Sequence, residues 1–208
     1  MTQRVALFLR KTAAVNDFKR ILTSFVSAKS LSGATVTSGF FQEDHKFKAS
    51  DLFKRPCTKQ VTPTHITFVG VYNSYWVPAF TSFGINLFSS KPCSCCTTIS
   101  FRKPKGAKWH AKVFIGSIGG HPRFGIIGSS NLTRPAADTT SPFNYEADAV
   151  MWYESDTEIN GLILERLERL GPGHVLVSTY AADDPLNAGI SLEQQLAAIE
   201  QEILGAGT

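Results

Sequence analysis

The sequence lacks any apolar run that approaches the ~20 residues needed to cross a bilayer as a helix. Its N-terminus, MTQRVALFLRKTAAV, has a short apolar patch but neither the core nor the cleavage site of a signal peptide. These two absences favour a cytoplasmic protein that makes no contact with a membrane. The chain has 208 residues, 43% of them hydrophobic, which is enough for one substantial core.

Cysteine is scarce, and its spacing is poor for a metal site. The four cysteines are Cys57 and the cluster Cys93, Cys95 and Cys96, which lacks the usual C-x₂-C spacing. A zinc site would need Cys57 or a histidine to complete it, and disulfides are disfavoured in the cytoplasm. We therefore expect reduced or buried thiols with no metal and no cofactor, and zinc is the alternative.

Acidic residues are scarce in the first two thirds of the chain. Up to Arg134 there are 19 Lys and Arg against 4 Asp and Glu, and from Pro135 onward there are 2 against 13. This asymmetry favours a basic surface that binds nucleic acid, although the two parts could instead neutralise each other within one fold. The candidate nucleic-acid-binding residues lie just ahead of His110 and are Arg102, Lys103, Lys105 and Lys108.

Hydrophobic periodicity predicts helices that alternate with strands. Helical spacing is found over 15–29, 76–89 and 158–170 and again from Ser191, whereas 34–40, 65–72, 97–102 and 174–179 are typical of strands. The aromatic residues of 76–89 are expected to pack on the sheet rather than stack on bases. Residues 42–63 are basic and could form a DNA-contacting loop with a short helix near Asp51–Arg55. We expect a catalytic domain over 1–180, followed over 181–208 by a linker and an acidic helix.

A candidate site lies between His110 and Glu146. In an extended segment His110 and Lys112 point the same way. The next apolar run ends at Gly128-Ser129-Ser130-Asn131, where small residues let backbone and hydroxyl groups approach a ligand. An imidazole, an ammonium, a hydroxyl and an amide that converge on one point suit a tetrahedral anion.

H-x-K followed by G-S-x-N resembles the signature of the phospholipase D superfamily, which His110, Lys112, Gly128, Ser129 and Asn131 match position by position. The family's acid five residues after the lysine is replaced by Ser117, and the extra residues 118–123 suggest a lengthened hairpin turn. The strand that ends in Ser38-Gly39 also resembles the restriction-enzyme branch. The resemblance implies an α/β fold with a mixed β-sheet flanked by helices on both faces.

The family usually carries two such motifs, and this chain has one. It therefore resembles the superfamily's small nucleases and the catalytic domains of some restriction endonucleases, which implies a homodimer with the active site at the twofold axis. The resemblance further implies that His110 forms a phosphohistidine, that Lys112, Asn131 and Ser129 hold the phosphate, and that Glu146 orients the imidazole. The expected activity is a metal-independent endonuclease acting on DNA, with RNA as an alternative substrate.

Several alternatives remain open. Asn131 could cap a helix that begins near Leu132, and Asp148 lies on the same strand face as Glu146. Ser130 is expected to point away from the ligand. The acidic C-terminal helix could cap the core, join a dimer, or lie over a basic groove as a DNA mimic. The alternative function is a nucleic-acid-binding or scaffold protein with little turnover, and a lipid phosphodiesterase is a third.

Overall fold

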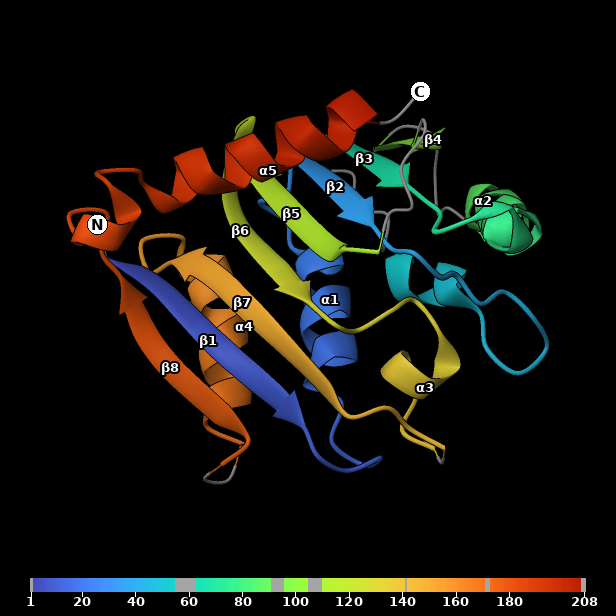
Figure 1. The fold of residues 1–208 in the computed structure, drawn as a ribbon, viewed down its shortest axis with the longest axis horizontal. Helices are drawn as coiled ribbons and strands as arrows, with labels where there is room; N and C mark the ends of the chain where they lie inside the picture. The colour runs from blue at the N-terminus through green and yellow to red at the C-terminus, as the bar shows by residue number, and fades with distance from the viewer. Residues whose placement is uncertain are drawn as a thin grey trace.

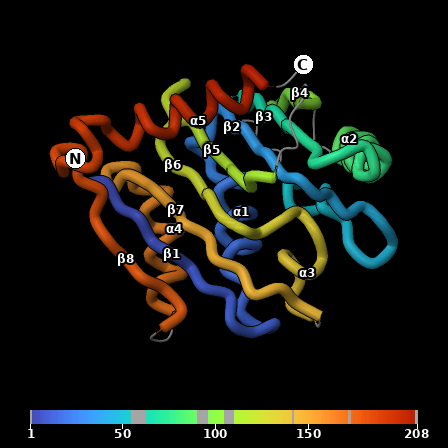
Figure 2. The backbone as a smooth tube through the Cα atoms, viewed as in Figure 1, coloured from blue at the N-terminus to red at the C-terminus, as the bar shows by residue number. Residues whose placement is uncertain are grey.

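The structure, a computed structural model, describes residues 2–54, 63–90, 96–104, 110–140, 142–170 and 173–206. Within these residues one sheet contains eight strands, in the spatial order β4 (Thr97–Arg102), β3 (Thr64–Val69), β2 (Gly33–Thr37), β5 (Lys112–Ile118), β6 (His121–Gly128), β7 (Glu146–Tyr153), β1 (Gln3–Arg10) and β8 (Val175–Tyr180). β2, β3 and β4 are parallel, and the other neighbouring pairs are antiparallel. The sheet is therefore mixed, with β4 and β8 at its opposite edges (Figure 2).

The helices lie on both faces of this sheet (Figure 1). They are α1 (Asp17–Ser27), α2 (Val77–Ser90), α3 (Arg134–Ala137), α4 (Thr157–Leu167) and α5 (Leu192–Ala206), with short 3-10 helices η1 (Ala49–Phe53), η2 (Ser74–Trp76) and η3 (Pro185–Asn187). The prediction of an α/β fold with a mixed sheet covered on both faces is confirmed. No helix among the described residues is both long and apolar enough to cross a membrane.

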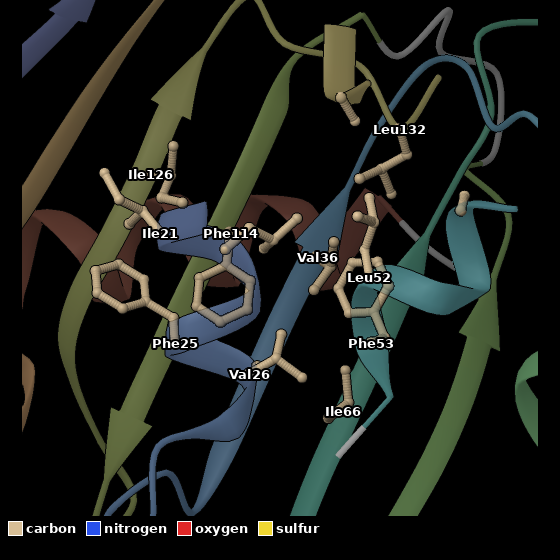
Figure 3. Packing of buried hydrophobic residues seen from close by; sticks show 14 of the residues in the cluster. Ile21, Phe25, Val26, Val36, Leu52, Phe53, Ile66, Phe114, Ile126 and Leu132 are labelled. Atoms are coloured by element: carbon tan, nitrogen blue, oxygen red, sulfur yellow. The ribbon is translucent and has the colours of Figure 1, made fainter. Parts of the chain in front are cut away.

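The larger core lies between the sheet and α1, α2, α4 and η1. α1 begins after Asn16, whose side chain accepts a hydrogen bond from the Lys19 N–H at 2.9 Å. The ring of Phe25 on α1 lies 4.6 Å from that of Phe124, measured between centroids. It lies 6.0 Å from the ring of Phe114, and Figure 3 shows Phe25 and Phe114 among the packed side chains. Full burial of such a side chain contributes roughly 1.5–3 kcal/mol, so this face positions the central strands that carry the site.

The second face is covered by α5. Leu192, Leu196 and Ile203 are at most 1% exposed and belong to a cluster with Val113 and Ile115 of β5. The helix starts with a capping box, in which Ser191 N–H donates to Gln194 Oε1 at 2.8 Å and Gln194 N–H donates to Ser191 Oγ at 3.2 Å. α5 therefore caps the core on this face of the sheet.

The hairpin between β5 and β6 differs from the expectation of a lengthened turn. The turn contains only Gly119 and Gly120, whose φ angles of 59° and 85° lie in the left-handed region that favours glycine. The extra residues instead lengthen the two strands, and the register shifts between Gly116 and Ser117. The prediction of a long turn was wrong because Ile118 belongs to β5 and residues 121–123 belong to β6, which leaves only the glycine pair between the strands.

Candidate active site

The candidate site lies at the end of the sheet where β5 begins. Lys112 is the first residue of β5 and pairs with Gly128, the last residue of β6, and β2 ends opposite at Thr37. Figure 1 shows these strand ends beside the segment that leads from β6 into α3. His110 comes two residues before Lys112, and Lys112 Nζ lies 2.9 Å from His110 Nδ1. The imidazole is exposed, whereas Lys112 is only 8% exposed.

Two aromatic rings surround the imidazole of His110. The rings of Phe40 and Tyr72 each lie 5.4 Å from it, edge to face. Lys112 Nζ lies 5.8 Å from the centre of the Phe40 ring, so the cation also faces an aromatic surface. Sequence reasoning did not identify Phe40 or Tyr72 as site residues. The only signal was the Ser38-Gly39 turn that precedes Phe40.

The Gly-Ser-x-Asn turn is held against β7 and against the end of β2. A Cβ atom at Gly128 would lie 2.1 Å from Asp148 Oδ1 and 2.7 Å from the Ala147 carbonyl oxygen, so only glycine fits. The Ala147 N–H donates to Ser129 Oγ at 3.0 Å. Ser38 Oγ donates to the Phe40 carbonyl at 2.8 Å and lies 3.3 Å from Asn131 Oδ1, and within the described residues no hydrogen bond is made by the Asn131 amide N–H groups.

Asn131 does not cap the helix that follows. α3 begins at Arg134 with Thr133 at the N-cap position, and Thr133 makes no side-chain capping bond. The helix starts later than the sequence suggested because Gln42 N–H donates to the Leu132 carbonyl at 2.9 Å and Phe41 bridges Leu132. Residues 131–132 are thus extended.

The two acidic side chains of β7 have different partners. Glu146, which is 5% exposed, accepts a short hydrogen bond from the hydroxyl of the exposed Ser129. Asp148 accepts from Ser130 Oγ at 2.6 Å and from Ser130 N–H at 3.2 Å, and both groups are buried. Ser130 therefore points inward, away from the imidazole. Among the described residues no hydrogen bond joins Glu146 to His110 of the same copy.

Burial sets the electrostatics of the site. It lowers the pKa of the Lys112 ammonium, and the nearby Glu146 carboxylate offsets part of this effect. Burial raises the pKa of Asp148 to about 6, although the hydrogen bonds from Ser130 act in the opposite direction. Arg10 of β1 stands next to Glu146 in the strand register and is 5% exposed. The Lys112 ammonium and the Arg10 guanidinium therefore both lie near the Glu146 carboxylate.

Arg10 also fixes the segment that follows the Gly-Ser-x-Asn turn. Its guanidinium donates to the carbonyl oxygens of Pro135 at 2.7 Å and Ala136 at 2.6 Å, and it also donates to that of Asp138. This role could not be predicted from the sequence, because Arg10 lies more than a hundred residues from these three acceptors. The guanidinium therefore ties β1 to α3.

The basic residues proposed for nucleic acid are only partly described. Arg102 ends β4 opposite Val69, at the same end of the sheet as the site, and Lys103 is exposed. Lys105 and Lys108 lie outside the described residues, as do Cys57, Cys93 and Cys95. Cys96 is partly exposed just before β4. Arg102 and Lys103 thus stand at the side of the site that β3 and β4 form.

No family model matches the chain, and no curated protein matches it. Among solved structures it is similar to NucT from Helicobacter pylori, with 15% identity, 80% of this chain and 96% of that chain covered, and a TM-score of 0.43. It is also similar to phosphatidylserine synthase from Haemophilus influenzae Rd KW20, with 12% identity, 98% and 47% covered, and a TM-score of 0.45.

A third similar structure is tyrosyl-DNA phosphodiesterase from yeast, with 13% identity, 71% of this chain and 32% of that chain covered, and a TM-score of 0.37. The chain thus spans nearly all of NucT but less than half of the other two proteins. At identities of 12–15% these likenesses concern the fold alone and do not identify a function.

Proposed function

We propose that this chain is a metal-independent phosphodiesterase of the phospholipase D superfamily that cleaves DNA through a phosphohistidine intermediate. The observation that carries the proposal is the contact of 2.9 Å between Lys112 Nζ and the exposed imidazole of His110, at the strand ends that also hold Ser129 and Asn131. A nucleophile beside a partly desolvated cation suits attack on an anionic phosphodiester, because the cation offsets the charge that builds up at phosphorus.

In the proposed first step a ring nitrogen of His110 attacks phosphorus, and the bond to the leaving oxygen breaks. A second imidazole protonates that oxygen as general acid. Water then attacks the phosphohistidine, the second imidazole accepts its proton, and His110 is released. Lys112 and the Asn131 amide hold the non-bridging oxygens, and Ser129 assists them. These groups neutralise the phosphate themselves, so the sequence of steps does not need a metal ion.

The second imidazole is proposed to be His110 of a second copy of the chain. The described residues place no other histidine against His110, since the ring contacts of His110 are with Phe40, Tyr72 and Lys112. A twofold axis next to the exposed imidazole would bring two copies of His110, Lys112 and Asn131 together. Glu146, a buried acid that accepts a hydrogen bond from the exposed Ser129, would then orient an imidazole across that axis.

DNA is the proposed substrate because the part of the chain up to Arg134, which includes His110 and Lys112, has an excess of positive charge. The first 134 residues hold 19 basic and 4 acidic residues, and of these Arg102 ends β4 and Lys103 follows it. A phosphate backbone is bound through such charges and independently of its sequence. We propose that target specificity, as in a restriction-type nuclease, comes from loops such as 42–63 or from another chain.

A nucleic-acid-binding protein with little turnover is the second candidate. One observation favours it: the described residues of a single copy place one imidazole at the site, and an attacking group without a general acid binds phosphate better than it cleaves it. The two candidates differ in their need for a second copy. Binding alone proceeds with a monomer, whereas cleavage requires association.

Nicking of supercoiled DNA in excess EDTA separates the candidates. The wild type is compared with His110→Ala and with His121→Ala, a matched control in the same hairpin whose side chain is 70% exposed. We expect nicking by the wild type and by His121→Ala, loss of at least a thousandfold in His110→Ala, and a dimer by sedimentation for all three. An acid-labile, base-stable phosphate bound to the wild type would identify the phosphohistidine. Binding without nicking by all three proteins would favour the second candidate.

A further inference from the structure

A pocket of about 480 Å³ opens beside the candidate site. Its lining includes Phe40 and Asn131, which also belong to the site, together with Gln42, Asp44, Trp76, Thr133, Pro135 and Asn144. The ring of Phe40 lies 5.4 Å from that of His110 on one side and 4.9 Å from that of Trp76 on the other. A group bound in this pocket is therefore within one nucleotide of a phosphate at His110.

Hydrogen bonds of the backbone fix the two segments that carry Phe40 and Trp76, the aromatic wall of this pocket. Tyr72 N–H donates to the Gly39 carbonyl at 2.9 Å, which ties the Phe40 loop to the segment after β3. The Asn73 side chain accepts from Tyr75 N–H at 3.1 Å and caps η2, the helix that carries Trp76. Phe40 and Trp76 are both partly exposed. Two rings that are fixed in place and accessible can stack on a planar ligand at little entropic cost.

The polar wall disfavours a second phosphate. Asp44 accepts hydrogen bonds from Gln42 Nε2 at 3.0 Å and from Lys46 N–H at 2.7 Å. Burial acts to raise the pKa of Asp44, but these hydrogen bonds and one from Phe47 N–H outweigh it, so the group carries a negative charge near neutral pH. A carboxylate repels phosphate but accepts hydrogen bonds from an exocyclic amine. The exposed Asn144 adds an amide that can pair with a base edge.

We infer that the pocket between Phe40, Trp76 and Asn131 binds an unpaired nucleobase next to the phosphate at His110. This inference rests on the proposed function and narrows its substrate, because a base that stacks on protein rings cannot stay paired in a duplex. The chain therefore acts preferentially on single-stranded or locally opened nucleic acid.

The test uses a single-stranded oligonucleotide and the same strand with one abasic position on either side of the cleaved phosphate. For the wild type we expect the abasic position that faces the pocket to lower kcat/KM by about tenfold, the usual size of a stacking contact. Trp76→Leu should lower kcat/KM by the same factor on the intact strand, and the abasic position should lower kcat/KM of this variant no further. Trp76→Phe keeps a ring and should retain most of the preference. Phe88→Leu, at a 46% exposed aromatic residue of α2 that does not line this pocket, is the matched control.

A binding measurement separates this inference from the proposed function. Fluorescence anisotropy in the His110→Ala background reports the affinity for both strands without turnover. A loss of affinity for the abasic strand that Trp76→Leu abolishes supports the pocket even if the wild type cleaves nothing. An equal effect of the abasic position in the parent and in Trp76→Leu overturns it even if cleavage proceeds, as does the absence of binding to either strand. Equal rates on single-stranded and duplex DNA also overturn it.

Discussion

The hydroxyl of Ser130 donates a hydrogen bond of 2.6 Å to Asp148 Oδ2, directly beneath the Gly-Ser-x-Asn turn. Both side chains are buried, with Ser130 1% and Asp148 4% exposed. The pair closes the inner side of the turn, whereas Ser129 and Glu146 form its outer side. One turn thus uses two serines and two buried acids, and of the four side chains that of Ser129 is exposed.

Asp148→Asn should remove part of the pH dependence of stability. Burial raises the pKa of Asp148 from 3.8 to about 6, so between these values the folded state binds more protons than the unfolded state. The stability that the neutral carboxyl contributes is present below about pH 4 and is lost as the pH rises to about 6. The shift corresponds to at most about 3 kcal/mol.

Urea unfolding at pH 4.5 and at pH 7.5 checks this prediction. The wild type should lose more unfolding free energy between the two values than Asp148→Asn does. Asp183→Asn, at an exposed carboxyl, should behave like the wild type. Identical losses in the wild type and Asp148→Asn would show that Asp148 is ionised throughout.

Gly128→Ala should destabilise the protein strongly, because the new Cβ would lie 2.1 Å from Asp148 Oδ1 and 2.7 Å from the Asp148 Cα atom. Neither the buried carboxyl nor the β7 backbone can move without breaking the bonds to Ser130. We expect a loss of about 2–4 kcal/mol. Gly161→Ala is the control, since a Cβ there meets nothing within 4 Å and the residue lies in α4. That control should stabilise the helix by up to ~1 kcal/mol. Similar melting temperatures for both variants would contradict the prediction.

Arg10→Lys should loosen the segment after the Gly-Ser-x-Asn turn. The guanidinium bonds to several carbonyls at once, and an ammonium cannot reach all of them from the same backbone position. Buried carbonyls left without a donor cost about 1–3 kcal/mol each, so we expect a total loss of about 2–4 kcal/mol. Amide hydrogen exchange should increase over 134–138. Arg4→Lys on the same strand alters part-exposed contacts with Glu154 and Thr179 and should leave stability nearly unchanged. Unchanged exchange in Arg10→Lys would refute this role.

Most strands and the main helices could be predicted because their signal is local, but β1 (Gln3–Arg10) was not among the expected strands. α1 repeats Ile21, Leu22 and Phe25 at helical spacing, and its observed bounds lie within two residues of the predicted ones. The clustering of His110, Lys112 and the Gly-Ser-x-Asn turn was also accessible, since one hairpin brings them together. Residues close in sequence need only the correct register to meet.

The rest of the site depends on contacts that no local pattern encodes. Phe40 and Tyr72 reach His110 only because β2 lies between β3 and β5 in the sheet. The separate partners of Glu146 and Asp148 were unforeseen for a related reason. Alternation placed both acids on one face of β7, but only the path of the turn decides which serine meets which acid. Periodicity identifies the face and does not identify the partner.

Lys112 should set the alkaline limit of activity. Burial lowers its pKa below the ordinary lysine value of 10.5, so the ammonium loses its proton at a lower pH than an exposed lysine does. If the ammonium holds the phosphate, the cleavage rate falls as the pH rises through that lowered value. Lys112→Met should lose about a hundredfold or more near neutral pH, whereas Lys46→Met, at an exposed site, should stay active. Lys112→Arg is the informative variant. Its guanidinium stays charged, so its residual activity, reduced by the different geometry, should show no alkaline fall up to pH 10. A pH–rate profile of Lys112→Arg that falls where the wild type falls would assign the alkaline limit to another group.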